Sequence, residues 1–296
     1  MELRSLIESH IRRASTRRNE ALSAIRIASC LSESDFNSLI YSRLFVEDNV
    51  TFDTEQYPLR DSLLKCVNLD MDSDLARIHF DATAKDSMMR TLAGNFQEFQ
   101  TVFDDFVLSV CAPRMSSCLV DCDQIYYQGF PCIRVVQPGE YSIGPHADVT
   151  YGHHPCSVNF YVPLTQIGGT SSLYLESRHG SEDWHPIVGD YGIVKQFAGA
   201  TCLHWTPENM MDYTRVSLDF RLIAGSMYDA LSCGGKIKGG QVDTYRKSPG
   251  YYSCCRKRQD GTWEREGDLL SPDARVGFPW TVKDWKQYID RKMNGA

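Results

Sequence analysis

The sequence predicts a mainly β core of the sandwich or jelly-roll type with flanking N-terminal helices, which is an α+β arrangement. Up to about residue 112, apolar residues recur at steps of three and four, as on one face of a helix. From about residue 132 to residue 224, short β segments are separated by Gly and Pro. Six or more short strands in about 90 residues are typical of a sandwich or a jelly roll and not of β-α-β units.

The 296 residues are enough to bury a full core as one domain with extensions. We expect a single domain over residues 1–296, with a helical scaffold at 1–112, a β core at 130–225 and an extension at 226–296. The extension is rich in Gly, Tyr and Arg, and Thr281 begins a capping box for a terminal helix. It could be a lid over the mouth of the β core or a cover for a sheet edge.

Three segments of the first half are expected to be helical. Residues 1–29 carry arginines interrupted by glutamates, which favours a solvated amphipathic helix over an organelle transit peptide. Ser32 has the position and type of an N-cap for a second helix. The apolar stripe at 84–110 predicts one long helix that packs against something large and that Pro113 stops.

The strands of the β core are expected at 132–137, 158–163, 171–176, 192–197, 201–205 and 214–223. No Gly-x-Gly-x-x-Gly and no Walker loop occurs in the chain, which disfavours the nucleotide-binding α/β folds.

Composition and charge narrow the function classes. A net charge of -7 and a pI near 5.6 argue against a nucleic-acid or anionic-membrane partner, since either would favour a basic surface. No apolar run approaches the roughly 20 residues that a membrane-spanning helix needs, and the N-terminus lacks the apolar core of a secretory signal. The eleven cysteines are odd in number and include no Cys-x-x-Cys, so we expect reduced thiols in a cytoplasmic protein.

A candidate metal site begins at His146 and Asp148. On an extended segment, residues two apart point the same way, so both side chains can reach one metal ion. His204 follows in a second predicted strand. Two imidazoles and one carboxylate form the 2-His-1-carboxylate triad of non-haem Fe(II) oxygenases, which leaves three coordination positions open.

A candidate anion clamp lies eleven residues after His204, at Arg215 and Ser217. Reading residues 214–223 as a strand places four polar residues on one face and four apolar residues on the other. Charged residues on one face of such a strand are costly unless that face lines a polar cavity. A guanidinium there can clamp a carboxylate through two hydrogen bonds, and Ser217 can donate a third.

These motifs, in this order and spacing, resemble the Fe(II)/2-oxoglutarate-dependent dioxygenase superfamily. The phrases around His146, Asn159 and Arg215 are similar to its streptomycin-biosynthesis-type branch, near the phytanoyl-CoA-type enzymes. The resemblance covers residues 130–225, about a third of the chain. It implies a double-stranded β-helix, a cupin-like jelly roll, with N-terminal helices supporting the larger sheet.

The resemblance also implies Fe(II) as the metal and 2-oxoglutarate and O2 as co-substrates, with 2-oxoglutarate converted to succinate and CO2 while a C–H bond is attacked. Arg215 and Ser217 would bind 2-oxoglutarate. Related halogenases replace the carboxylate ligand with a small residue, so Asp148 disfavours halogenation. Hydroxylation, desaturation and ring closure all stay open.

Other polar residues allow two interpretations each. Asn159 would touch the co-substrate or form ordinary strand hydrogen bonds. Arg134 and Arg221 would bind the co-substrate or an anionic substrate, or else form structural ion pairs, with Asp219 as the partner of Arg221. His153 and His154 are expected in a surface loop, whereas His179 and His185 are expected to be structural and Trp205 to pack. These last five have no predicted chemical role.

The expected substrate is a small polar metabolite or an amino-acid-derived natural product, because the chain is acidic and no accessory recognition module is evident. Kainoid synthases, which close a pyrrolidine ring on a prenylated glutamate, would match the size and the extra arginines. Two alternatives remain: a cupin-like isomerase or ligand-binding module with the same three ligands, and an interaction domain without turnover. The sequence predicts no oligomeric state.

Overall fold

A computed structural model describes residues 2–41, 47–69, 74–119, 121–231 and 251–267. Its helices in the first half are α1 (Glu2–Ser29), α2 (Glu33–Ile40), α3 (Leu59–Cys66), α4 (Ala84–Gly94), α5 (Gln97–Phe106) and α6 (Ala112–Ser116), with a 3-10 helix η2 (Leu75–Phe80) and a π-helical turn η3 (Val107–Cys111). The later helices are η4 (Asp148–Tyr151), η5 (Gly169–Ser171) and α7 (Gly225–Ala230).

The strands form two antiparallel sheets. The larger sheet runs β1 (Asp48–Thr51), β7 (Ile193–Phe197), β4 (Val158–Pro163), β9 (Arg215–Ala224), β2 (Gln124–Gln128), β10 (Tyr252–Lys257) and β11 (Trp263–Glu266), and β3 (Cys132–Val136) also pairs with β9. The smaller sheet is β6 (His185–Pro186), β5 (Tyr174–Leu175) and β8 (His204–Trp205). This curled, half-barrel arrangement with flanking helices confirms the predicted jelly-roll class.

β9 is the central strand of the larger sheet. One of its edges pairs with β4 from Ser217 to Leu222, and the other edge pairs first with β3 and then with β2. Every second residue of β9, from Val216 to Leu222, is fully buried in the main hydrophobic cluster, as the predicted alternation requires. The alternate residues face the inside of the half-barrel, where the functional site lies.

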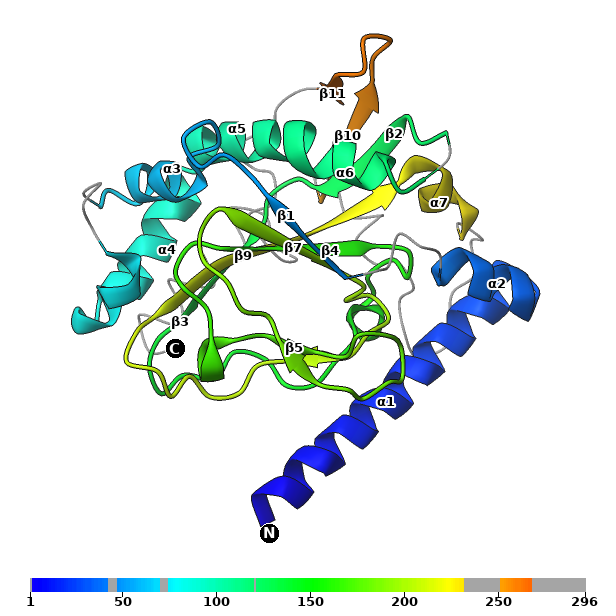
Figure 1. The fold of residues 1–296 in the computed structure, drawn as a ribbon, viewed down its shortest axis with the longest axis horizontal. Coiled ribbons are helices and arrows are strands. Elements are labelled where there is room, and N and C mark those ends of the chain that lie inside the picture. Colours follow the sequence, from blue (N-terminus) through cyan, green and yellow to red (C-terminus); the bar gives the residue numbers. More distant parts are fainter. Residues whose placement is uncertain (1, 42–46, 70–73, 120, 232–250, 268–296) are drawn as a thin grey trace.

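Helices cover the outer face of the larger sheet. Figure 1 shows α3, α5 and α6 above the sheet, with α1 running diagonally along the molecule. Phe103 of α5 contacts Phe220 of β9 edge to face at a centroid distance of 4.9 Å, and Phe106 contacts it at 6.4 Å. These ring contacts fix the sheet to the helices and hold the inner face of β9 in place.

The predicted long helix at 84–110 is wrong in two respects. The first helix ends at Gly94, a residue type that favours helix ends. After Asn95, a new helix begins at Gln97. Pro113 does not stop the helix either. Ala112 donates its backbone N–H to Val107 O, five residues earlier, and this widened turn lets the chain continue into α6 with Pro113 near its start.

Other predictions about the helices and strands are confirmed. α2 begins after Ser32, whose hydroxyl accepts a hydrogen bond from Asp35 N. The expected strands are all present, although those at 171–176 and 201–205 shorten to two residues each. Residues 252–266 add two strands to the larger sheet beside β2 and therefore cover an edge. The predicted terminal helix at Thr281 lies outside the described residues.

The ten cysteines among the described residues form no disulfide with one another. Within the described ranges, no helix is both long enough and apolar enough to cross a membrane.

Candidate metal centre

Backbone pairing brings His146, Asp148 and His204 together. His146 and His204 form an isolated antiparallel bridge, with N···O distances of 3.1 and 2.9 Å between their main chains. Ala147 is extended and Asp148 then begins η4, where its N–H donates to Gly199 O at 2.9 Å. The side chains two residues apart therefore point the same way, and main-chain hydrogen bonds hold all three residues.

The ligand atoms of the three residues lie within 4.8 Å of one another, and all three side chains are buried. Oδ1 of Asp148 is 3.4 Å from Nε2 of His146 and 3.5 Å from Nε2 of His204. Ligands about 2.1 Å from one metal ion at right angles would be about 3 Å apart, so a small adjustment suffices. Among the described residues, this is the group of three or more such side chains that fits a metal ion.

Both histidines are oriented for metal binding through Nε2. Nδ1 of His146 lies 2.9 Å from Gly144 O, and Nδ1 of His204 lies 3.1 Å from Cys202 O. Because a carbonyl oxygen can only accept, each Nδ1 carries the proton and each Nε2 keeps its lone pair. Burial, together with the neighbouring His146, lowers the pKa of His204 to about 3, so this imidazole is neutral at pH 7.

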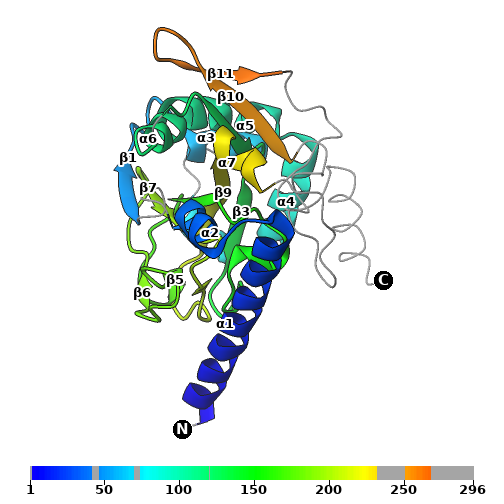
Figure 2. The ribbon, with the colours of Figure 1, turned by 90° about the vertical axis from the view of Figure 1, so that its right-hand side faces the viewer.

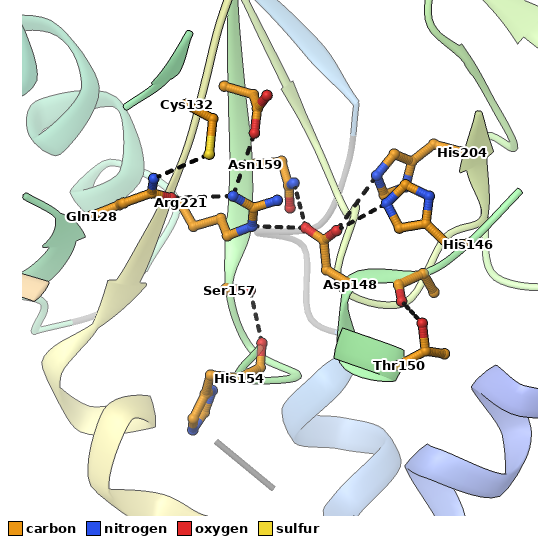
Figure 3. A network of polar contacts seen from close by, with 12 residues as sticks. Gln128, Cys132, His146, Asp148, Thr150, His154, Ser157, Asn159, His204 and Arg221 are labelled. Atoms are coloured by element: carbon orange, nitrogen blue, oxygen red, sulfur yellow. Dashed lines mark hydrogen bonds and ion pairs between the residues drawn. The ribbon is translucent and has the colours of Figure 1, made fainter. Parts of the chain in front are cut away.

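The two oxygens of Asp148 have different environments, as Figure 3 shows. Oδ1 faces the histidines, whereas Oδ2 accepts hydrogen bonds from Nε of Arg221 at 2.8 Å and from Nδ2 of Asn159 at 2.7 Å. Burial alone would raise the pKa of Asp148, but the Arg221 guanidinium and the nearby histidines hold it well below its usual range. The carboxylate is therefore ionised and presents one oxygen to a metal.

Arg221 and Arg134 form the structural ion pairs that the sequence allowed. Besides Asp148, Arg221 lies 3.4 Å from Asp219 Oδ1 and donates to Gln128 Oε1 at 3.1 Å. Arg134 donates to Asp219 Oδ2 at 2.6 Å. Substrate binding by either arginine, and contact of Asn159 with a co-substrate, remain predictions.

Arg215 and Ser217 lie on the same face of β9, and each has a donor group that forms no hydrogen bond with the described residues. Arg215 donates through Nη1 to Ser171 O at 3.1 Å, while its Nε has no hydrogen-bond partner among the described residues. The same is true of the Ser217 hydroxyl, and both side chains are buried. Buried donors without partners favour a site that is completed by a ligand.

A small cavity of about 40 Å³ is lined by Arg215 together with His146 and His204. Its polar lining includes both histidine ligands and all the arginines discussed above, and strands of both sheets contribute to it. The lining residues are Arg134, Ser142, Ile143, His146, Asn159, Tyr161, Leu173, Phe197, His204, Thr206, Arg215, Asp219 and Arg221. The inner face of β9, the metal ligands and the smaller sheet therefore meet in one place.

The prediction that His153 and His154 lie in a surface loop is wrong. Each is 1% exposed, because Gly152 adopts a left-handed conformation with φ 87° and the chain turns inward after η4. Burial and the Arg221 guanidinium hold the pKa of His153 well below its usual range. Both imidazoles are thus buried and not at the surface, and that of His153 lies close to Arg221 and Asp148.

The remaining aromatic and histidine residues have the structural roles expected of them. His185 contacts Glu47 at 2.6 Å, and Nδ1 of His179 lies 3.2 Å from Thr201 O. Trp205 stacks on Tyr174 at a centroid distance of 5.3 Å.

Sequence reasoning missed Arg18 and Glu176. Arg18 is buried in α1 and forms an ion pair with Glu176, which follows β5. Oε1 of Glu176 also accepts the N–H of Leu203 at 2.8 Å, next to the ligand His204. A signal existed: Arg18 falls four residues after Ala14 and four before Leu22, on the apolar face of the helix.

Comparisons with known proteins give one match in sequence. No family model matches the chain. It is 34% identical over 108 residues to "Streptomycin biosynthesis protein StrG" of Streptomyces griseus, which is 36% of this chain. The chain spans about half (51%) of the length of that curated relative.

Among solved structures, the apo form of the non-heme monooxygenase ThoJ matches with a TM-score of 0.49 and 12% identity over 87% of this chain and 100% of that one. The non-heme alpha ketoglutarate dependent epimerase SnoN from nogalamycin biosynthesis matches with a TM-score of 0.36 and 11% identity over 71% and 95% of the two chains. The resemblance that the motifs predict, to a streptomycin-biosynthesis protein, is confirmed by the match to StrG.

Proposed function

We propose that this protein is a non-haem Fe(II) oxygenase that uses 2-oxoglutarate and O2 to oxidise a C–H bond of a small polar metabolite or an amino-acid-derived natural product. In a hydroxylation, one oxygen atom of O2 enters the product and the other enters succinate, and 2-oxoglutarate loses CO2. Ring closure, including a kainoid-type pyrrolidine closure, is a second outcome of the same chemistry.

The observation that carries the proposal is that two incomplete sites share one cavity. His146, Asp148 and His204 supply three ligands on one side of a metal position. Arg215 and Ser217 supply buried donors without partners in the same cavity lining or beside it on β9. A metal that binds three protein ligands has room for a chelating keto acid, and the far carboxylate of that acid needs such donors.

The residues have separable roles in this proposal. The triad would hold Fe(II), which when bound supplies the oxidising chemistry with O2. Arg221 and Asn159 orient the Asp148 carboxylate so that only Oδ1 meets the metal. Arg215 would exchange its hydrogen bond to Ser171 O for two bonds to the far carboxylate of 2-oxoglutarate. Because 40 Å³ is room for only a few waters, the side chains at the mouth would move as the co-substrate enters.

A cupin-like isomerase or ligand-binding module is the second candidate. It would use the same three ligands. It needs no arginine with a free Nε beside an unpartnered hydroxyl on β9, so the reserve of donors at Arg215 and Ser217 favours the oxygenase.

The test is anaerobic addition of Fe(II) and then 2-oxoglutarate to metal-free protein, followed by the visible spectrum. We expect a weak charge-transfer band from bidentate chelation that is absent in His204→Ala. Arg215→Ala should keep Fe(II) binding and raise the 2-oxoglutarate concentration needed for half of the band by tenfold or more, on the order of a charged hydrogen bond. Bound Fe(II) without a band would make the isomerase or binding module the better interpretation.

A further inference from the structure

A second cavity, of about 290 Å³, shares His146 with the metal centre. One wall is α1, which contributes His10, Arg13 and Arg17, and the other is the loop that leads to and follows the first two ligands. The three α1 residues are spaced three and four apart, so they form one stripe along the helix. The volume is near the lower end of the range for small-molecule sites, about 300 Å³.

The cavity is lined by positive charge, whereas the whole chain is negatively charged. The protein has a net charge of -7, yet none of the described residues that line the cavity carries a carboxylate. Arg13 donates to Ser9 Oγ on its own helix at 3.2 Å, and neither Arg13 nor Arg17 forms an ion pair with a carboxylate in the described part of the chain. Two guanidiniums that have no carboxylate partner among the described residues therefore line one cavity beside a metal ligand.

The opposite wall supplies aromatic surface. Tyr141 is 59% exposed and Tyr151 is 50% exposed, although both are large side chains. Tyr151 contacts the His146 ring edge to face at a centroid distance of 5.1 Å. A molecule lying against the two tyrosines would thus reach the ring that binds the metal.

α1 is held against the metal centre by more than its apolar face. The buried ion pair between Arg18 and Glu176 joins α1 to the main chain beside His204, through the hydrogen bond from Leu203 N. Arg17 is the residue next to this anchor, so the helix backbone that carries Arg17 is held in place relative to the metal ligands. Figure 2 shows the amino-terminal half of α1 extending beyond the body of the molecule, with its later turns beside the β core.

We propose that this cavity binds the primary substrate, and that the substrate carries an oxyanion, a phosphate ester or a carboxylate, that Arg13 and Arg17 hold. Guanidinium pairs suit both groups, since each offers several oxygens to planar N–H donors. Tyr141 and Tyr151 flank the uncharged part, which extends toward the metal at His146. The proposal rests on the proposed function for its metal, and it assigns the substrate anion to α1, because Arg134 and Arg221 are already paired with Asp219 and Asp148.

The test measures the binding of small anions next to the metal. Protein loaded with Mn(II) is titrated with methyl phosphate and, separately, with acetate, and paramagnetic relaxation of the methyl protons is recorded against Zn(II)-loaded protein. We expect enhanced relaxation that saturates, with the stronger of the two anions identifying the substrate group. The double variant Arg13→Gln/Arg17→Gln should weaken binding about tenfold or more, as loss of charged hydrogen bonds predicts.

Arg12→Gln is the matched control, because Arg12 is exposed on the same helix and does not line the cavity. Glutamine has nearly the helix propensity of arginine, so the variants should fold, which circular dichroism checks. Equal relaxation in the double variant and the native protein would overturn the proposal. If Mn(II) fails to bind at all, the proposed function fails, and saturation-transfer NMR on metal-free protein then decides the anion site alone: loss of the methyl phosphate signal in the double variant supports it, and an unchanged signal overturns it.

Discussion

Nε of Arg221 donates a hydrogen bond of 2.8 Å to Oδ2 of Asp148, so a buried guanidinium lies directly behind the carboxylate of the metal triad. The contact removes one of the two oxygens from metal binding and leaves Oδ1 for the metal. It also keeps the carboxylate ionised inside a low-dielectric site, where burial alone would favour the protonated form. Arg221 is thus a positioning residue for the metal centre.

Replacing Arg221 with Gln should weaken metal binding about 10- to 100-fold, the usual effect of losing a partner of a metal ligand. With Arg221 gone, the pKa of Asp148 rises, so protons compete with the metal more strongly and the loss should grow as the pH falls. Titration with Co(II) at several pH values measures both effects.

Arg134→Gln is the control for that variant, because Arg134 also pairs with Asp219 but does not contact Asp148. It should bind metal with nearly native affinity. A similar loss in both variants would show that the integrity of the ion-pair network, and not the Arg221–Asp148 contact, determines metal affinity.

Gly199→Ala should disturb the same carboxylate from the other side. A Cβ at Gly199 would lie 2.6 to 2.7 Å from the side-chain amide of Asn159, too close for either group to stay in place. Asn159 would then lose its hydrogen bond to Asp148 Oδ2, and metal affinity should fall by about tenfold.

Gly168→Ala is the matched control for Gly199→Ala, because a Cβ at Gly168 would have no atom within 4 Å. Gly261→Ala is unsuitable as a control, because its φ of +88° would strain an alanine whatever the space around it. Metal titration of Gly168→Ala should give the native affinity. An unchanged affinity in Gly199→Ala would mean that Asn159 can shift without releasing Asp148.

How much the sequence could predict depends on the range of each interaction. The inward face of β9 and the His146–Asp148 pair follow from the alternation of side-chain directions over a few residues, so both could be predicted from the sequence. Arg18 and Glu176 lie 158 residues apart in the sequence, and no local sequence pattern around either residue identifies the other as its partner. The π-helical turn before Pro113 could not be predicted either, because an apolar pattern typical of a helix does not distinguish hydrogen bonds to the fourth preceding residue from those to the fifth.

Breaking the pair of Arg18 and Glu176 should destabilise the protein strongly. Arg18→Met leaves the Glu176 carboxylate buried with only backbone N–H donors, from Leu203, Gly180 and Glu182. Removal of one partner of a buried ion pair costs about 3 to 5 kcal/mol of unfolding free energy, and these remaining donors place the expectation at the lower end. Urea unfolding of metal-free protein measures the loss.

Glu264→Gln is the control, because it removes a carboxylate from an exposed pair with Arg258. The expected cost there is below about 1 kcal/mol. Equal and small losses in the two variants would show that α1 is held by its apolar face alone.

The carboxyl group of Asp104 should make stability depend on pH. Asp104 accepts hydrogen bonds from Tyr127 at 2.8 Å and from Arg265 at 2.7 Å, yet burial, opposed only in part by Arg265, raises its pKa to about 6. The folded state then holds the proton more tightly than the unfolded state, whose pKa is near 3.8. The stabilising contribution of protonation is therefore fully present below about pH 4 and is lost as the pH rises through 6.

Asp104→Asn should remove this dependence while keeping a side chain of the same shape. Two pKa units correspond to about 3 kcal/mol, so the native protein should lose about that much stability relative to the variant between pH 4 and pH 7. Urea unfolding of metal-free protein across this range measures the difference, and Glu98→Gln, an exposed carboxylate on the same helix, provides the control. A difference between native protein and Asp104→Asn that stays constant with pH would show that Arg265 keeps Asp104 ionised, and that the β10–β11 edge is held by a full ion pair.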